Sequence, residues 1–129
     1  MSTNINEILK YAIETKASDL HLSSGSIPMV RIDGMMKALQ LPIMNDEGML
    51  KISQEVLNDN QSKILSENLE IDFSYELEGF GRFRVNFFNQ INGLSAAFRI
   101  IPSTILSSEE LSIPPIINQL AFLDKGLVL

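Results

Sequence analysis

The sequence has 129 residues, with 16 acidic and 10 basic side chains and a formal net charge of −6. This length suits a single domain with one core. The content of 45% hydrophobic and 20% charged residues is typical of a globular chain rather than a disordered one. The acidic balance argues against a broad nucleic-acid surface. The absence of cysteine excludes disulfides and thiol catalysis, and a lone histidine leaves little for a metal site.

No apolar run approaches the roughly 18 residues of a membrane span, and the first residues lack the basic and hydrophobic regions of a signal peptide. We therefore expect a soluble, cytoplasmic protein. Acidic residues are absent between Glu78 and Glu109, where three arginines fall: Arg82, Arg84 and Arg99. Such a local basic site can bind a small anion such as phosphate. The alternative is three arginines solvated on exposed strands.

The first part of the chain predicts a helix, a short strand and a hairpin. Apolar residues at helical spacing over 5–13 predict the helix. The period then changes to two at residues 20–22, which predicts a strand. Asp33-Gly34 is typical of a two-residue type I′ turn and predicts a hairpin between strands 28–32 and 35–39.

The middle of the chain predicts two further helices and a strand. Asn45 or Asp46 can cap a helix that continues to about residue 57. A shorter helix follows over 61–68. Alternating apolar and polar residues over 71–77 then predict a half-buried strand.

A second hairpin is predicted from residues 82–91 and 94–101, which flank Asn92-Gly93. If these two residues form the loop, Arg84 lies diagonal to Arg99 on the face away from the core. Two guanidinium groups repel each other, so an anion is expected between them. A carboxylate of this chain and a bound phosphate both fit that requirement.

Residues 102–129 predict a connector, a helix that begins at Pro114-Pro115, and the start of a strand at Leu127-Val128-Leu129. Because chain termini are usually polar and exposed, we expect a further element after this apolar stretch. Altogether the patterns predict an α+β fold with about five or six antiparallel strands and three or four helices.

Other candidate sites are weaker. Asp19 and His21 share one face of a predicted strand, but no Ser or Cys nucleophile accompanies them in a recognisable setting. Asp72, Glu76 and Glu78 are typical of a solvated strand face. The phosphate-cradling motif G-x-x-x-x-G-K-[ST] does not occur. We therefore expect no metal site and no ATP hydrolysis by this chain alone.

Several segments closely resemble one protein family, and they keep its order and spacing over nearly the whole chain. The segments are Ala-Ser-Asp-Leu-His-Leu-Ser (17–23), Pro-Met-Val-Arg-Ile-Asp-Gly (28–34), Leu-Glu-Ile-Asp-Phe-Ser-Tyr (69–75), Gly-Arg-Phe-Arg-Val-Asn (81–86), Phe-Arg-Ile-Ile-Pro-Ser (98–103) and Leu-Ser-Ile-Pro-Pro (111–115). The family is that of the PilT-like type IV pilus retraction ATPases, within the secretion ATPase superfamily.

The resemblance implies a PAS-like N-terminal domain over residues 1–101, with helices packed on one face of an antiparallel sheet. Residues 102–129 would lead, through a connector, a helix and a first strand, into a RecA-like ATPase domain that carries the Walker A and Walker B motifs. The full protein would be a cytoplasmic homo-hexamer that binds ATP and Mg²⁺. It would dock on inner-membrane pilus platform proteins and power retraction in twitching motility, without inserting into the membrane or binding nucleic acid.

The resemblance also implies roles for single residues. Arg84 and Arg99 correspond to arginines that reach the γ-phosphate region of bound nucleotide, with Arg82 as a less direct third. Three connector residues correspond to a stretch that borders the adenine: Leu106, Leu111 and Pro114. Tight nucleotide binding by this chain alone is not expected. Two alternative functions remain open, a free-standing PAS-like small-ligand module and a protein-interaction domain.

Overall fold

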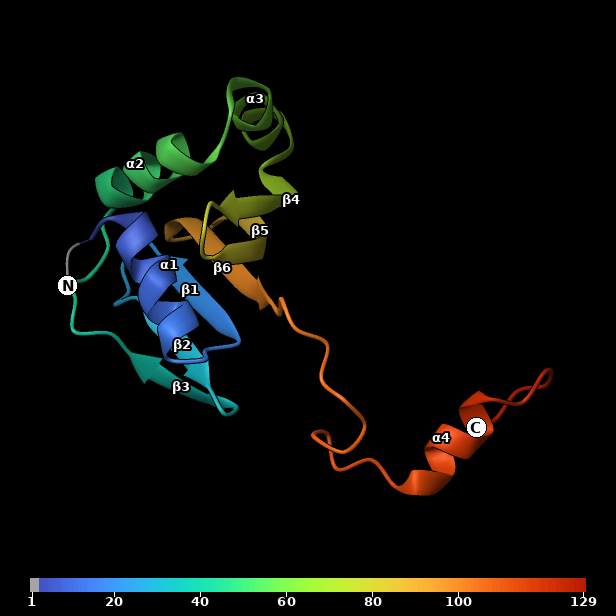
Figure 1. The fold of residues 1–129 in the computed structure, drawn as a ribbon. Coiled ribbons are helices and arrows are strands. Elements are labelled where there is room, and N and C mark those ends of the chain that lie inside the picture. Colours follow the sequence, from blue (N-terminus) through green and yellow to red (C-terminus); the bar gives the residue numbers. More distant parts are fainter. Residues whose placement is uncertain (1–2) are drawn as a thin grey trace.

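The computed structural model describes residues 3–129, and a six-stranded antiparallel sheet lies at the centre of the fold (Figure 1). The strand order is β3-β2-β1-β6-β5-β4. The strands are β1 (Asp19–Ser23), β2 (Met29–Ile32), β3 (Met35–Ala38), β4 (Glu70–Leu77), β5 (Gly81–Gln90) and β6 (Gly93–Ile101). The helices are α1 (Ile5–Glu14), α2 (Asp46–Val56), α3 (Asp59–Asn68) and α4 (Pro115–Ala121). The predicted α+β class is confirmed.

The hydrophobic core lies between one face of the sheet and the helices α1, α2 and α3. Apolar residues of these helices belong to the same buried cluster as Leu20, Phe83 and Phe98 of the strands. Phe98 packs edge-to-face on Phe83 and on Phe87, with ring centroids 6.4 and 6.1 Å apart. The opposite face of the sheet is open and polar, because the side chains of a strand alternate between faces.

An asparagine is the N-cap residue of each of the helices α1, α2 and α3. Asn4 accepts a hydrogen bond from a first-turn backbone amide of α1, and Asn45 does the same for α2. At α3, Asn58 and Gln61 form a reciprocal capping box. The helix therefore begins at Asp59, two residues earlier than the predicted 61–68.

The two hairpins differ in how well the sequence predicts them. The Asp33-Gly34 loop is confirmed, and both residues have the positive φ of a type I′ turn, +51° and +79°. In the second hairpin Gln90 pairs with Gly93, so the loop is Ile91-Asn92 and not Asn92-Gly93.

The predicted register of the second hairpin was therefore wrong by two residues. Gly93, with φ of +118°, takes the positive-φ position after the loop, whereas the predicted two-residue loop at Asn92-Gly93 would need it inside the loop. A shift of two residues leaves every side chain on its predicted face. It does move Arg84 from a diagonal position to one directly opposite Arg99.

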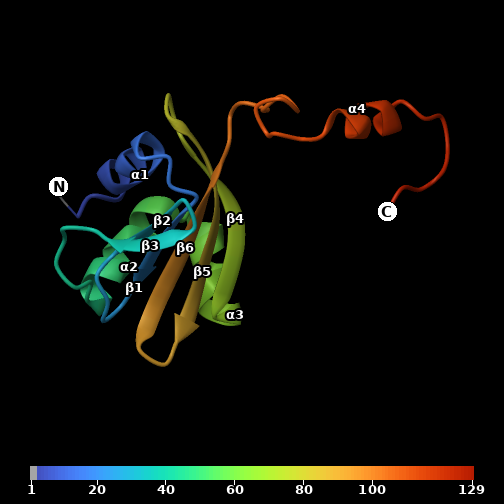
Figure 2. The same cartoon turned by 90° about the horizontal axis from the view of Figure 1, so that it is seen from below.

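Residues 102–129 leave the sheet after β6 and extend away from it (Figures 1 and 2). The predicted helix is present as α4, with Pro114 as its N-cap and no buried residue. The predicted strand start at Leu127-Val128-Leu129 has no strand conformation in the structure. A strand needs a hydrogen-bonded neighbour, and no described strand pairs with this stretch.

The close fit of Gly93 predicts a specific loss of stability. An added Cβ would lie 2.5 Å from Asp46 Oδ1 and 3.0 Å from Ser24 Cβ, besides the cost of a positive φ. We expect Gly93→Ala to lower the free energy of unfolding by about 2 kcal/mol, measured by urea denaturation. Gly79→Ala is the matched control, because Gly79 also has positive φ but an added Cβ there meets open space. Equal losses in the two variants would contradict the close-contact argument.

Candidate functional site

The open face of the sheet carries a row of charged side chains that crosses four adjacent strands. The register places Arg31 of β2 beside Asp19 of β1, Asp19 beside Arg99 of β6, and Arg99 beside Arg84 of β5. Each of these residues alternates along its strand with side chains of the core. Because the apolar side chains are buried on one face of the sheet, the charged side chains of these strands lie together on the opposite face.

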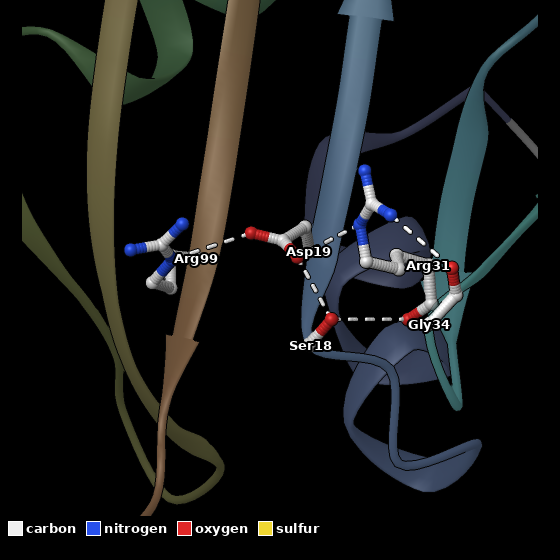
Figure 3. Close-up of polar contacts among 5 residues, drawn as sticks. All are labelled: Ser18, Asp19, Arg31, Gly34 and Arg99. Carbon is white, nitrogen blue, oxygen red and sulfur yellow. Dashed lines mark hydrogen bonds and ion pairs between the residues drawn. The ribbon is translucent and has the colours of Figure 1, made fainter.

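Asp19 is the shared partner of two arginines (Figure 3). Its Oδ1 lies 3.3 Å from Arg99 Nε, and its Oδ2 lies 3.5 Å from Arg31 Nε. The Ser18 hydroxyl donates a hydrogen bond of 2.7 Å to Oδ2, and Arg31 Nη1 donates one of 3.2 Å to the Gly34 carbonyl. The Asp19 side chain is 14% exposed, whereas that of Arg99 is 73% exposed.

These contacts determine the charge of Asp19. Burial alone would raise its pKa, but the hydrogen bonds from Ser18 and Arg99 and the positive charge of Arg99 outweigh burial and lower the pKa below its ordinary value of 3.8. Asp19 is therefore ionised at neutral pH and holds both guanidinium groups as ion pairs.

Arg84 has a different carboxylate partner. Its Nη2 and Nε lie 3.0 and 3.2 Å from the two oxygens of Asp72 on β4, a bidentate pair. The hydrogen bonds and charge of Asp72 raise the pKa of Arg84 above its ordinary value. Each arginine of the facing pair thus has a carboxylate of this chain as its ion-pair partner. No ion pair of the described residues joins one carboxylate to both of them.

A shallow hollow of about 180 Å³ lies over these side chains. It is smaller than the roughly 300–1,000 Å³ typical of a small-molecule site, so its size suits a single anionic group. His21 lies in it, and its Nε2 is buried without a hydrogen-bond partner among residues 3–129. The residues that line the hollow are Asp19, His21, Asp72, Arg84, Asn86, Ala97 and Arg99.

The structure brings together only part of the predicted site. Arg84 and Arg99 face each other, but Arg82 lies opposite Ile101, pairs with Glu76 at 4.0 Å and does not line the hollow. The three candidate adenine-bordering residues are exposed in the segment that leaves the sheet, and none lines the hollow: Leu106, Leu111 and Pro114. Their role and that of Arg82 stay predictions.

The sequence alone did not identify the carboxylates as arginine partners. Asp19 and Asp72 were visible as polar strand residues, but nothing local indicates which strand lies next to which. Asp19 and Arg99 are 80 positions apart in the chain. Only the pairing of β1 with β6 makes them neighbours.

Known proteins similar to this chain include pilus motors. It is 42% identical over 126 residues to the type IV pilus retraction ATPase PilT of Pseudomonas aeruginosa, covering 98% of this chain and 37% of that protein. It is 48% identical over 102 residues to a twitching motility protein of Neisseria gonorrhoeae, covering 79% of this chain and 27% of that protein. This chain is homologous to the N-terminal domain of PilT-like ATPases.

Solved structures agree with this assignment. A crystal structure of the pilus retraction motor PilT with bound ADP matches with a TM-score of 0.76 at 40% identity, over 91% of this chain and 34% of that one. The ATPase DotB of Legionella pneumophila matches with a TM-score of 0.77 over 95% of this chain and 35% of that one, but at 19% identity this likeness shows only the fold. The chain spans about a third of the length of these PilT-like relatives.

No family model matches the chain. Among the described residues, no helix has the length and apolar character needed to cross a membrane.

The lowered pKa of Asp19 predicts a pH-dependent stability. Its ionised form contributes stability above pH 3.8, and this contribution is lost as the pH falls through the still lower folded-state pKa. We expect Asp19→Asn to unfold at lower urea concentration than wild type at pH 7, and the difference to shrink below pH 3.8. The control Asp124→Asn changes an exposed carboxylate outside the sheet and should match wild type throughout. A stability difference that does not change with pH would contradict the role given to the ionised carboxylate.

Proposed function

We propose that this chain is the N-terminal domain of a cytoplasmic, hexameric ATPase that powers type IV pilus retraction. In this proposal Arg84 and Arg99 contact the terminal phosphate of a nucleotide held by an ATPase domain. The identity with PilT supports the motor, and the ADP in the PilT crystal structure supports the nucleotide. The observation that carries the proposal is the placement of two exposed guanidinium groups directly opposite each other on an uncovered sheet face.

The phosphate group of ATP fits these residues. Guanidinium groups present a fork of N–H donors that matches phosphate oxygens, and the hollow has room for one such group. The sequence contains no P-loop, so the rest of the nucleotide has to be bound by another domain. The arginines would then act from outside that domain, as positive charges presented to the phosphate.

Mg²⁺ does not fit this face of the sheet. No group of three or more acidic or histidine side chains among residues 3–129 is arranged to hold a metal. Asp19 and Asp72, the carboxylates at the hollow, are already paired with arginines. We therefore assign the Mg²⁺ that accompanies ATP to the ATPase domain.

The exposed face and the extended segment suit contacts with neighbouring subunits. In the proposal, residues 1–101 form the domain that carries the arginines, and residues 102–129 connect it to the ATPase domain. Leu106, Leu111 and Pro114 of this connector would border the adenine. Pilus platform proteins at the inner membrane would be the further partners, which places the motor at the membrane without an insertion.

The proposal predicts the activity of arginine variants in the full-length ATPase. Arg84→Ala and Arg99→Ala should each lower ATP turnover at least about tenfold, which corresponds to roughly 1.4 kcal/mol of barrier. Both side chains are highly exposed, so circular dichroism and hexamer assembly should stay near wild type. Turnover is measured by phosphate release.

Lys63→Ala is the matched control. Lys63 is an exposed cation on α3 with only a marginal contact of 4.0 Å to Glu67, so its loss should not change turnover. Wild-type turnover in both arginine variants, with intact hexamers, would reduce these arginines to structural ion pairs and overturn the proposal.

A further inference from the structure

The two facing arginines are held in different ways. Asp72 engages Arg84 through both Nε and the terminal nitrogen Nη2. Asp19 engages Arg99 through Nε alone. Within residues 3–129 neither terminal nitrogen of Arg99 donates a hydrogen bond. Arg99 can therefore offer both terminal nitrogens to an anion without giving up its partner, whereas Arg84 has one of them already engaged.

The two carboxylates also differ in how firmly they are held. Asp19 lies on β1, inside the sheet, and is fixed from three sides by Ser18, Arg31 and Arg99. Its side chain is 14% exposed, against 46% for Asp72 on the edge strand β4. A partner that is already ordered orients a flexible arginine at a lower entropic cost. Asp19 can thus orient its arginine partner more firmly than Asp72 can.

The charge balance also favours Arg99 over Arg84 as the group that attracts an anion. One carboxylate, Asp19, is shared by Arg31 and Arg99, so this cluster keeps a net charge of about +1 when all groups are ionised. The pair of Arg84 with Asp72 is neutral. An anion that approaches the hollow is therefore attracted more strongly to the Arg99 side.

We infer that Asp19 is a positioning residue, which orients Arg99 so that its two terminal nitrogens make the primary contact with the phosphate. Arg84 is then the secondary contact. The inference rests on the proposed function, because it concerns the same phosphate and the same arginines.

The orientation can be tested in this chain without any nucleotide. Hydrogen exchange of the Arg99 Nε–H, measured by NMR, should be faster in Asp19→Ala than in wild type, because its acceptor is lost. Asp72→Ala is the matched control, since it removes the other carboxylate and should speed exchange at Arg84 only. Unchanged exchange at Arg99 in Asp19→Ala would overturn the inference.

The consequence for catalysis is tested in the full-length ATPase with Asp19→Ala, Arg99→Ala and the double variant. Asp19→Ala should lower kcat roughly three- to tenfold, with KM for ATP changed less than about twofold, because the guanidinium stays charged but is no longer aimed. The double variant should have the same kcat as Arg99→Ala. Asp19→Asn retains an oxygen acceptor and should therefore recover part of the lost kcat. Asp72→Ala should lower kcat less than Asp19→Ala does.

The possible failures are distinguishable. Loss of activity in Arg99→Ala combined with normal kcat in Asp19→Ala would overturn the positioning role and leave the proposed function standing. Losses that multiply in the double variant would also overturn it, because Asp19 would then act independently of Arg99. Normal activity in Arg99→Ala with a loss in Arg84→Ala would overturn the inference and leave the proposed function standing. Normal activity in both arginine variants would overturn the proposed function itself.

Discussion

The pairing of β6 with β1 on one side and β5 on the other is the constraint on which both faces of this protein depend. Phe98 of β6 packs between Phe83 and Phe87 in the core, and the next residue, Arg99, points to the open face. A slip of one residue would place the guanidinium in the core and the ring in solvent. The aromatic contacts of the core therefore hold the register that sets Arg99 beside Asp19 and opposite Arg84.

That register creates an unusual charge arrangement on one sheet. Like charges directly opposite each other on neighbouring strands are destabilising, and the fold offsets the repulsion of Arg84 and Arg99 with carboxylates from the next strands outward, Asp72 and Asp19. Exposed ion pairs contribute little stability. The arrangement is better explained as a way to keep two guanidinium groups oriented on an open face than as a source of folding energy.

The acidic composition of the whole chain conceals this local site. The formal net charge of −6 describes the whole chain. Around the hollow, three arginines share two carboxylates and keep a net charge of about +1. Charges at short distance dominate over distant ones at physiological ionic strength. In the proposed function, the phosphate of a nucleotide is the anion that these arginines contact.

Local patterns in the sequence determined the helices, the first hairpin and the face that each strand residue takes, because periodicity, caps and Asp33-Gly34 act over a few residues. Arg84 and Arg99 were therefore placed on the open face correctly, even though the loop was assigned one residue too late and the register was wrong by two residues. The tertiary structure decided that β1 lies next to β6, and so which carboxylate holds Arg99. Strand order is set by long-range packing of the core, across 80 positions for Asp19 and Arg99, and no local pattern in the chain encodes it.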